Sequence, residues 1–412
     1  MVENLFGTDG IRGLVNLEQM DDEIAIMRLI EHREISPAIM TLIGESLGRM
    51  ANHEPAQKMT VVVGWDDRPA NIKLAESLTI GLNIAEFEVV HIGLCATPTL
   101  HLATLSNNAE FGCMITASHN PVEDSGLKIF NKYGYKTTPD FEQNLSHTAI
   151  RLAQEERDLD QIDLDLLQRP AKTFSLEEWT IPKHREWLET RAYALSKLVN
   201  FQPISSSVKL NTPLLIDSSK GTASIWFAKW LSSWGITAIE VSNEALALNL
   251  NCGAGEFSPT QTWTFDEAKN SSHQLIKKLP KCGPGLIVAA ALDGDGDRCL
   301  LIESTKTGYQ VIDGDRIADT FVNSVTKAGQ SWTLAASIES DLSLTTNLDR
   351  FQNKVESLET AVGDRWLSFA LSGGESNHVF VESDSIPTLI GVEDSGHIVL
   401  PAPHPHSTNQ WS

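Results

Sequence analysis

Several features that would identify a protein at once are scarce or missing in this sequence. No apolar run reaches the roughly 18–20 residues that a membrane-spanning helix needs, so no membrane partner is expected. The first residues, MVENLFGTDGIRG, show no basic segment followed by an apolar one, so no secretory signal is expected either. Cysteine is also scarce, and the 5 residues are widely spaced, unlike a disulfide framework or a zinc site. These absences predict a reduced, cytoplasmic protein.

Basic residues are few in comparison with acidic ones. The chain has 32 Lys and Arg against 54 Asp and Glu, which gives a formal net charge of −22. Because such a field repels nucleic acid and anionic membrane surfaces, neither is expected as a partner. An anionic substrate therefore needs local basic side chains or a metal ion. Most of the acidic residues have a simpler explanation, which is that they keep the protein in solution.

What the sequence does contain is an alternation of strand and helix patterns. Residues 59–66 and 87–94 are short apolar runs of the kind that form buried strands. Between them, residues 71–86 repeat leucine at helical spacing. A helix at 97–107 and a strand at 111–118 are expected to follow. This order predicts an α/β fold with a mixed, mostly parallel sheet.

At 412 residues the chain is too long for a single core. A charged, apolar-poor stretch at 151–170 is the best candidate for a linker, after which the strand and helix pattern restarts. We expect three α/β domains, and whether the last of them is complete is left open. Their limits are 1–165, 166–305 and 306–412. The final residues, LPAPHPHSTNQWS, lack periodicity and predict a flexible tail rather than a metal site at His404 and His406.

A short acidic loop carries the strongest chemical signal. Residues 292–298, LDGDGDR, place Asp293, Asp295 and Asp297 directly after an apolar strand. The intervening glycines allow a tight turn, so the carboxylates can converge on one hard cation, for which Mg²⁺ is the natural choice. A calcium EF-hand does not fit, because no Glu stands at the twelfth position and the loop lies between strands. A purely structural turn is the alternative, whereas Arg298 is suited to bind a phosphate oxygen.

A second loop joins a buried strand to a serine. Residues 113–121, CMITASHNP, end an apolar run at Ser118 and His119 and stop it with proline. SHNP alone is more often a turn, and a serine protease lacks support because the GxSxG elbow and a third catalytic residue are missing. Beside three carboxylates and a divalent metal, the hydroxyl of Ser118 suits phosphate chemistry, in which it carries a phosphoryl group. His119 and Lys128 are both candidates for the general acid or base.

The stretch GVEDSGH at 391–397 alternates Glu393, Ser395 and His397. If this segment is extended, the three side chains lie on one side of it. Side chains arranged in this way can hydrogen-bond the hydroxyls of a sugar. As a lone motif the signal is weak.

Taken in order, these stretches resemble the alpha-D-phosphohexomutase family. FGTDGIRG at 6–13 is similar to its N-terminal signature, TASHNP at 116–121 to its phosphoserine loop, and DGDGDR at 293–298 to its metal loop. GVEDSGH is similar to the sugar-recognition loop, and AVGDRW at 361–366 to a further loop that faces the substrate. Five ordered motifs along most of the chain argue against a chance match. The resemblance implies successive three-layer α/β domains with mixed, mostly parallel sheets around a central active-site cleft.

The resemblance also implies roles for individual residues. Ser118 is expected to carry the phosphoryl group and to bind the metal together with the three aspartates. Arg12 takes the position of the phosphate-contacting arginine, and Lys128 that of a neighbouring active-site lysine. Substrate binding is expected from three loops. Their residues are Arg298, Gly363, Asp364, Arg365, Glu393, Ser395 and His397.

Within the family, FGTDGIRG near the start and LNLNCGAG at 248–255 are most similar to the enzymes that act on amino sugars. The implied reaction interconverts glucosamine 6-phosphate and glucosamine 1-phosphate through a phosphoserine and a bisphosphorylated sugar. It implies Mg²⁺ as cofactor and a sugar bisphosphate as activator, and it leaves a homodimer open. GVEDSGH differs from the GEQSGH common in glucosamine enzymes, so mannose and glucose phosphates are alternative substrates.

The family's fourth domain carries the motif RxSGTEP, whose side chains hold the phosphate that is not being transferred. No such motif occurs in this sequence, so we expect the fourth domain to be absent. Remote phosphate binding holds a sugar in register for transfer. Two alternatives follow from its loss. One is a non-catalytic remnant that binds sugar phosphate or a partner protein, and the other is a metal-dependent phosphatase in which water reaches the phosphoserine.

Overall fold

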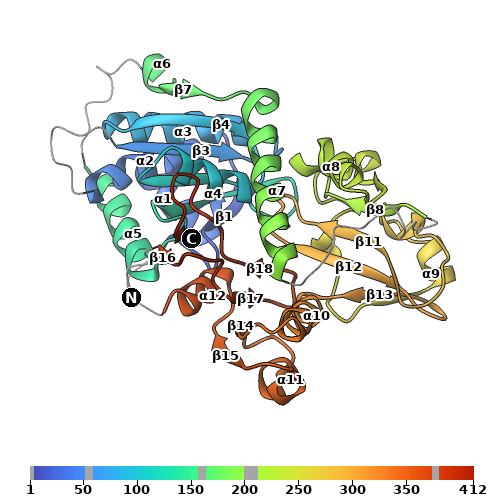
Figure 1. Cartoon of the computed structure of the whole chain (residues 1–412). Coiled ribbons are helices and arrows are strands. Elements are labelled where there is room, and N and C mark those ends of the chain that lie inside the picture. Colours follow the sequence, from blue (N-terminus) through green and yellow to red (C-terminus); the bar gives the residue numbers. More distant parts are fainter. Residues whose placement is uncertain (1–3, 52–58, 156–163, 199–211, 374–379) are drawn as a thin grey trace. The chain divides into compact units, whose positions relative to one another are not determined.

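The computed structural model describes residues 4–51, 59–155, 164–198, 212–373 and 380–412. The chain divides into two units, Met1–Pro182 and Lys183–Ser412, and Figure 1 labels their elements. No helix in the described ranges is long and apolar enough to cross a membrane. Residues 156–163 of the expected linker lie outside the described residues.

The first unit is built on a 7-stranded mixed sheet. In spatial order its strands are β2 (Glu34–Ile35), β1 (Ile11–Val15), β6 (Asp124–Asn131), β5 (Phe111–Ile115), β3 (Thr60–Trp65), β4 (Glu88–Leu94) and β7 (Lys172–Thr173). All neighbours are parallel except β6, which runs antiparallel to β1 and to β5. Because β3, β4 and β5 are parallel, the segments that follow them emerge at one edge of the sheet.

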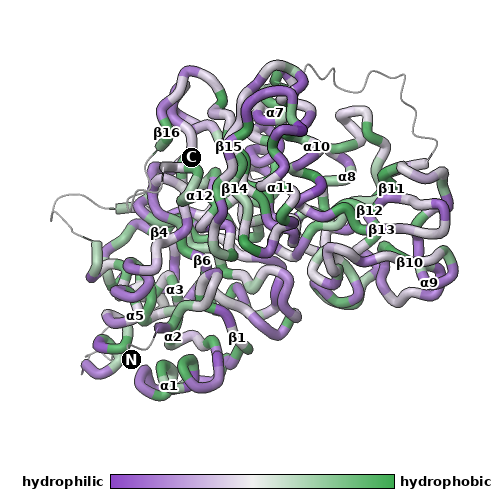
Figure 2. The backbone as a smooth tube through the Cα atoms, turned by 90° about the horizontal axis from the view of Figure 1, so that it is seen from below, coloured by the Kyte–Doolittle hydropathy of each residue, from purple (hydrophilic) through white to green (hydrophobic). Residues whose placement is uncertain are grey.

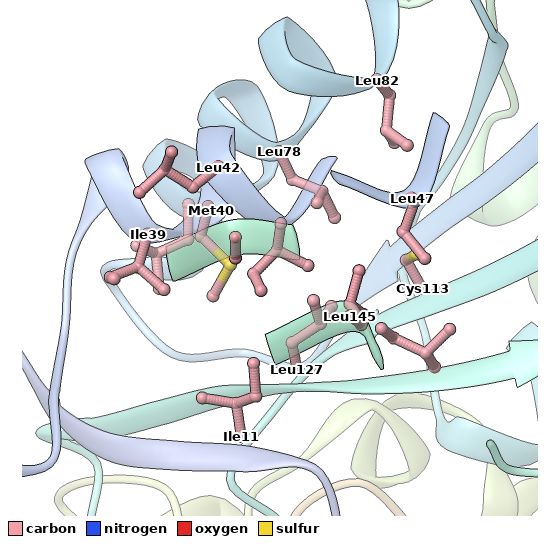
Figure 3. Packing of buried hydrophobic residues seen from close by; sticks show 14 of the residues in the cluster. Ile11, Ile39, Met40, Leu42, Leu47, Leu78, Leu82, Cys113, Leu127 and Leu145 are labelled. Atoms are coloured by element: carbon pink, nitrogen blue, oxygen red, sulfur yellow. The ribbon is translucent and has the colours of Figure 1, made fainter. Parts of the chain in front are cut away.

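Helices cover both faces of this sheet. On one face lie α1 (Asp22–His32), α2 (Pro37–Met50), α3 (Asn71–Ile84) and α5 (Pro139–Ala153), and on the other lies α4 (Thr97–Ser106). Successive strand residues point to opposite faces, so Val61 and Val63 join the first core while Val62 joins the core beneath α4. Figure 3 shows the first core, in which Leu78 of α3 and Leu127 of β6 both take part. The unit also contains α6 (Leu164–Leu167) and the π-helix η2 (Leu176–Thr180).

Two of these helices begin with the same local signal. The side chain of Ser36 accepts the amide N–H of Ile39 at the start of α2, and the side chain of Thr138 accepts that of Phe141 at the start of α5. In both, proline occupies the first helical position, where its missing N–H costs nothing. The sequence therefore defines where these helices start.

The second unit contains a 6-stranded sheet. In spatial order its strands are β10 (Thr262–Thr264), β13 (Gly308–Ile312), β12 (Cys299–Ser304), β11 (Leu286–Leu292), β8 (Leu214–Asp217) and β9 (Ala238–Glu240). β8, β9 and β11 are parallel, and the remaining pairs are antiparallel. β11 has the sequence LIVAAAL, and Figure 2 shows a hydrophobic stretch of backbone there. Short helices lie between these strands, namely η3 (Thr222–Ile225), α8 (Phe227–Ser233), η4 (Ser242–Glu244), η5 (Ala254–Glu256), α9 (Phe265–Lys269) and η6 (Ile276–Lys278).

A 4-stranded sheet follows in the same unit. Its order is β15 (Val355–Thr360), β14 (Trp332–Ser337), β17 (Leu389–Val392) and β18 (Ile398–Val399). The helices of this unit outside the 6-stranded sheet are α7 (Ile181–Leu198), α10 (Gly314–Lys327), α11 (Leu342–Thr346), η7 (Leu348–Arg350) and α12 (Asp364–Leu371). α10 places Ala318, Val322 and Val325 on one face, the helical spacing of an apolar stripe, and these residues are buried in one core with Trp332 and Leu334.

The expected α/β architecture with mixed, mostly parallel sheets is confirmed. The domain limits at 165/166 and 305/306 stay a prediction. β7 belongs to the first sheet and β13 to the second.

The prediction of a flexible C-terminal tail is wrong. β19 (Gln410–Trp411) pairs antiparallel with β16 (Val381–Glu382), and the side chain of Trp411 is buried. Its Nε1 donates a hydrogen bond to the carbonyl oxygen of Ser383 at 2.9 Å. A strand of two residues is too short to show alternation, so periodicity could not reveal it.

Candidate active site

The Ser118 loop (residues 116–123) connects β5 to β6 in the first unit. The amide N–H of Ser118 donates to Oγ1 of Thr116 at 2.8 Å, and that of Asn120 donates to the carbonyl of Ala117 at 3.0 Å. Ser118 has φ of 54°, a left-handed conformation that costs a non-glycine residue roughly 1–2 kcal/mol. The surrounding turn therefore imposes the backbone conformation of Ser118, whose side chain is buried.

Basic side chains gather around Asp9 beside this loop. Arg12 of β1 pairs with the carboxylate of Asp9, and its Nη1 donates to the carbonyl of Ala117 at 3.5 Å. Nζ of the buried Lys128 in β6 lies 3.5 Å from the same carboxylate, and Nζ of Lys136 lies 2.6 Å from it. Three basic side chains therefore gather at one carboxylate, and groups of this kind can bind phosphate.

All four residues predicted to be catalytic lie in this unit. Arg12 and Lys128 are brought near the loop because β1, β6 and β5 are consecutive in the sheet. His119 follows Ser118 and is half-buried. The structure therefore brings Arg12, Ser118 and Lys128 onto neighbouring elements, although they lie far apart in the sequence, while their catalytic roles stay predictions.

The acidic loop (residues 293–298) connects β11 to β12 in the second unit. One carboxylate oxygen from each of Asp293, Asp295 and Asp297 lies within 4.8 Å of the others. Oδ1 of Asp293 accepts the amide N–H groups of Asp297 and Arg298, both at 3.1 Å. Asp293 and Asp295 are buried, and buried carboxylates at such short range repel one another without a counter-charge. This all-oxygen donor set fits a hard divalent cation.

The segment after β8 supports the acidic loop. β8 and β11 are parallel neighbours, so both end at the same edge of the sheet. Oγ of Ser219 donates to the carbonyl of Leu292, the residue before the acidic loop, at 2.8 Å. A Cβ atom at Gly221 would lie 2.3 Å from the carbonyl oxygen of Gly294. Only glycine allows so close an approach of the two backbones.

Asp217, the last residue of β8, is fully buried beneath this segment. Its Oδ1 accepts the amide N–H of Ser219 at 2.9 Å, whereas Oδ2 has no hydrogen-bond partner among the described residues. Oδ2 lies 3.9 Å from Nδ1 of His273. Burial lowers the pKa of His273 to about 4, so the imidazole is neutral. Burial also raises the pKa of Asp217 to about 7, because the ionised carboxylate loses its hydration.

The hairpin loop (residues 393–397) connects β17 to β18. The segment is not extended throughout, because Gly396 adopts φ of 94° and the chain reverses. The amide N–H of Glu393 donates to the carbonyl of His397 at 3.0 Å, and Nδ1 of His397 lies 2.6 Å from Oε2 of Glu393. Glu393 and His397 therefore contact each other, while Ser395 lies in the turn and is half-buried.

Arg298 and His397 connect the acidic loop to the hairpin loop. They form an isolated antiparallel bridge, and Nε of Arg298 lies 3.3 Å from Nε2 of His397. Nε2 of His397 also lies 3.1 Å from Oδ1 of Asp297. Burial by itself lowers the pKa of His397, but the carboxylates of Asp297 and Glu393 outweigh it and raise the pKa to about 10. The high pKa favours the charged form of His397, whose Nδ1 faces Glu393 and whose Nε2 faces Asp297 and Arg298.

The third predicted loop, at Gly363, is attached to the hairpin loop. Gly363 has φ of 118° and precedes α12, which begins with Asp364 and Arg365. The amide N–H of Gly363 donates to Oε1 of Glu393 at 2.6 Å. Burial raises the pKa of Glu393, but the hydrogen bonds from His397 and Gly363 outweigh it and lower the pKa. The predicted substrate-binding residues therefore lie on three connected loops of one unit.

Sequence reasoning missed several polar residues that hold these loops in place. They are Asp9, Asp66, Arg68, Asn71, Thr116, Lys136, Asp217 and Ser219. A signal was available, because DDRPAN at 66–71 directly follows β3 and DSSKG at 217–221 begins with the last residue of β8. Polar residues at the carboxyl ends of parallel strands gather at one edge of a sheet. The sequence does not show which strands are neighbours in the sheet. The two motifs alone therefore could not predict which loops these polar residues support.

Comparison with known proteins agrees with this geometry. Residues 3–156 match the family model described as phosphoglucomutase/phosphomannomutase, alpha/beta/alpha domain I. That range contains β1 to β6 and the Ser118 loop.

Curated relatives extend the similarity to nearly the whole chain. The phosphoglucosamine mutase of Jannaschia sp. (strain CCS1) is 28% identical over 404 residues, which cover 97% of this chain and 75% of the relative. The phosphoglucosamine mutase of Rhodococcus erythropolis (strain PR4 / NBRC 100887) is 29% identical over 400 residues, with the same coverage of 97% and 75%.

Solved structures show the same fold. A protein of Thermus thermophilus superposes with a TM-score of 0.62 at 20% identity, covering 99% of this chain and 77% of that one. A phosphoglucomutase/phosphomannomutase family protein of Burkholderia thailandensis superposes with a TM-score of 0.59 at 20% identity, covering 97% and 72%.

Proposed function

We propose that the chain belongs to the alpha-D-phosphohexomutase family and that it interconverts glucosamine 6-phosphate and glucosamine 1-phosphate. The observation that carries the proposal is the similarity to phosphoglucosamine mutases over 97% of the chain. The Ser118 loop and the acidic loop supply the kinds of group that this reaction needs, a hydroxyl nucleophile and a set of hard metal ligands.

Ser118 is the proposed phosphoryl carrier. The oxygen of a sugar hydroxyl forms a bond to phosphorus while the bond between phosphorus and Oγ of Ser118 breaks, and the hydroxyl proton passes to a general base. The resulting bisphosphate then returns its other phosphoryl group to Ser118. Lys128 and His119 are the candidate bases. Because the Ser118 side chain is buried, transfer requires its surroundings to open toward the substrate.

Arg12 is proposed to stabilise the phosphoryl group during transfer, and so is Lys128 in its protonated form if His119 is the base. Both side chains now face the carboxylate of Asp9. Phosphoryl transfer is catalysed mainly by positioning and by neutralising the charge on the phosphoryl oxygens. Cations that a protein carboxylate already orients lose little conformational entropy when phosphate takes its place, which favours their use here.

The acidic loop is proposed to hold Mg²⁺ through Asp293, Asp295 and Asp297. Their oxygens converge within 4.8 Å, and oxygen ligands of this kind fit Mg²⁺ better than metals that prefer nitrogen or sulfur. When bound, the ion neutralises negative charge on the transferring phosphoryl group. The proposal includes Ser118 as a further ligand.

Recognition of the sugar is assigned to the connected loops of the second unit. Arg298 is proposed to bind the substrate phosphate, and Glu393, Ser395 and His397 the sugar hydroxyls. The carboxylate of Glu393 already accepts from His397 and Gly363, yet each of its oxygens keeps a free lone pair for a hydroxyl donor. The loop at Gly363, Asp364 and Arg365 is included because it is bound to Glu393.

The proposal also covers partners and location. A sugar bisphosphate is expected as activator, because the first turnover needs a phosphorylated Ser118. A homodimer is a further part of the proposal. A cytoplasmic location is favoured by the cysteines, since all 5 are free thiols.

The test is a mutase assay on the full chain with Mg²⁺ and glucose 1,6-bisphosphate. Glucosamine 6-phosphate, mannose 6-phosphate and glucose 6-phosphate are compared side by side, and ³¹P NMR follows the 6-phosphate, the 1-phosphate and free phosphate in one experiment. We expect the fastest isomerisation on glucosamine 6-phosphate. Faster turnover of a neutral hexose phosphate would reassign the substrate. Release of free phosphate without isomerisation would replace the mutase by a phosphatase, and ligand binding without turnover would indicate a remnant.

A further inference from the structure

The side chain of Arg68 is fully buried next to the Ser118 loop. Arg68 lies between β3 and α3, and both it and Asp66 have side-chain exposures of 0%. Its position follows from the sheet order, because β3 and β5 are parallel neighbours whose carboxyl ends share one edge. The segment after β3 therefore lies beside the segment after β5, which is the Ser118 loop.

All five N–H groups of the Arg68 guanidinium are used within this unit. Nη2 donates to the carbonyl oxygens of Ser118 at 2.8 Å and Asn120 at 3.0 Å. Nη1 donates to the carbonyl of Asp124 at 2.8 Å and to that of Pro121. Nε donates to Oδ2 of Asp66 at 3.1 Å. A guanidinium has five donors and no acceptor, so this set leaves none for another ligand.

These contacts replace the backbone ladder that the loop lacks. Residues 118–121 lie between two strands, and buried carbonyls without a partner are costly. Arg68 supplies a donor to Ser118, Asn120 and Pro121, and to Asp124 at the start of β6. One side chain therefore fixes the whole backbone path from Ser118 to β6.

The counter-ion of Arg68 extends the same network to the other side of Ser118. Oδ2 of Asp66 also accepts from Oγ1 of Thr116 at 2.7 Å, and Oγ1 of Thr116 accepts the amide N–H of Ser118 at 2.8 Å. Nδ2 of Asn71 donates to Oδ1 of Asp66 at 2.6 Å and to the carbonyl of Ile115 at 3.0 Å. Both peptide groups of Ser118 are thus held by the pair of Asp66 and Arg68. A left-handed backbone persists only where its surroundings determine it in this way.

We propose that Arg68 is a positioning residue for phosphoryl transfer, which it serves by holding the Ser118 backbone in the conformation that aims the phosphoserine. This inference rests on the proposed function. Arg68 differs from Arg12 because its charge is neutralised by Asp66 and its donors all serve the protein. It is therefore not a phosphate ligand, and its removal should change the rate of transfer rather than the binding of the sugar.

The test compares Arg68→Lys with a matched control. Lysine keeps the charge but has three donors on a point-like ammonium, so it cannot reproduce five contacts in a plane. Arg350→Lys is the control, because Arg350 also pairs with an aspartate, Asp319, and donates to the carbonyls of Ser343, Leu344 and Asn347. Arg350 lies at η7, in the other unit from the Ser118 loop.

Two readouts are measured on the full chain. For Arg68→Lys we expect kcat to fall by about 10²-fold with KM within about threefold of wild type, since misplacing a reacting group by about 1 Å has that effect on rate. We also expect amide exchange in a peptide spanning residues 116–124 to become at least about tenfold faster while exchange in β3 and β5 stays unchanged. Arg350→Lys should change neither quantity.

A wild-type kcat in Arg68→Lys would overturn the proposal, and so would an equal loss of kcat in both variants. If Arg68→Lys does not fold, because Asp66 is left as a poorly compensated buried charge, the double variant Asp66→Asn/Arg68→Gln removes both charges and is measured in the same way. If the wild-type chain shows no mutase activity, the proposed function fails. The exchange comparison then decides by itself whether Arg68 holds the loop.

Discussion

The Ser118 loop and the acidic loop occupy equivalent places in two different sheets but are held by opposite charges. Each follows a buried strand and leads into an antiparallel neighbour, β5 into β6 and β11 into β12. In the first loop a cation, Arg68, collects backbone carbonyl groups. In the second a carboxylate, Asp293, collects the amide N–H groups of Asp297 and Arg298.

The comparison indicates whether each loop needs a bound ligand to keep its structure. The Ser118 loop is complete without a ligand, because the charge of Arg68 is matched by Asp66 and its donors are all used. The acidic loop brings three carboxylates within 4.8 Å of one another, and although Arg298 and His397 lie beside them, a divalent cation would neutralise more of their charge. We therefore expect the first loop to keep its structure without metal and the second to depend on it.

The largest effect should come from the hydroxyl of the first loop. Ser118→Ala should lower mutase turnover by at least about 10³-fold, because no other group carries the phosphoryl group. Alanine accepts the same backbone about as well as serine, so the melting temperature should match the wild type, whereas Mg²⁺ affinity should fall because the variant removes one proposed ligand. A mutase assay, thermal melts and calorimetry measure these quantities. Thr148→Ala, which removes an exposed hydroxyl of α5, is the control. Retained turnover in Ser118→Ala would exclude Ser118 as the carrier.

The next effect tests the charge of the second loop. Asp295→Asn should weaken Mg²⁺ binding by at least about 100-fold, because it removes one of three ligands. At Mg²⁺ concentrations of about 100 times Kd, binding stabilises the wild type by about 2.7 kcal/mol, and the variant should lose most of this gain. Urea unfolding with and without Mg²⁺ measures this gain in stability for each protein. Asp349→Asn removes an exposed charge and should behave as wild type. Equal stabilisation of both variants by Mg²⁺ would remove Asp295 from the metal site.

A smaller effect should separate the support of the acidic loop from its ligands. Gly221→Ala adds a Cβ atom 2.3 Å from the carbonyl oxygen of Gly294, so the acidic loop or the segment that supports it must shift. Changes behind a metal site commonly lower affinity by about 10- to 100-fold, and we expect a loss in that range. Gly283→Ala is the matched control, since its added Cβ atom meets nothing within 4 Å. Calorimetric titration with Mg²⁺ is the measurement, and identical affinities in the two variants would contradict the role of Gly221.

The last effect concerns the stability of the chain without metal, and it depends on pH through Asp217. Its folded-state pKa of about 7 exceeds the ordinary value of 3.8, so the folded chain binds this proton more tightly than the unfolded chain. Stability is therefore lost as pH rises from about 4 to about 7, by at most roughly 4 kcal/mol. Asp217→Asn keeps an acceptor for Ser219 and removes the charge. Without metal, it should be more stable than wild type at pH 8 and equal to it at pH 4.

Urea unfolding at both pH values measures this difference. Asp349→Asn again serves as the exposed control and should show no comparable gain at pH 8. A gain of the same size at pH 4 and pH 8 would show that titration of Asp217 is not its cause.

Local signals were sufficient for much of the fold and for the chemical groups of the site. The apolar run that becomes β3 and the leucine spacing that becomes α3 are visible in a short window, because side-chain direction repeats every two residues in a strand and about every 3.6 in a helix. The convergence of Asp293, Asp295 and Asp297 was also predictable, since it depends on glycines within one turn.

Contacts between distant segments were not predictable in this way. Arg298 and His397 are 99 residues apart, and they meet in an isolated antiparallel bridge between the acidic loop and the hairpin loop. The sequence left open whether GVEDSGH is extended, and in the structure the left-handed Gly396 reverses the chain and brings Glu393 to His397. Glycine permits a left-handed conformation but does not require it, so the residue type alone could not predict that the chain reverses at Gly396.

By itself, the sequence determined the α/β class, the acidic loop, and the serine at the end of a buried strand. Each depends on neighbours within about ten residues, where chain geometry leaves few choices. The tertiary structure alone decided which groups hold those loops. Arg68 reaches the carbonyl of Ser118 across 50 residues only because β3 and β5 are adjacent strands. Strand order depends on the packing of the whole sheet, and no local pattern contains it.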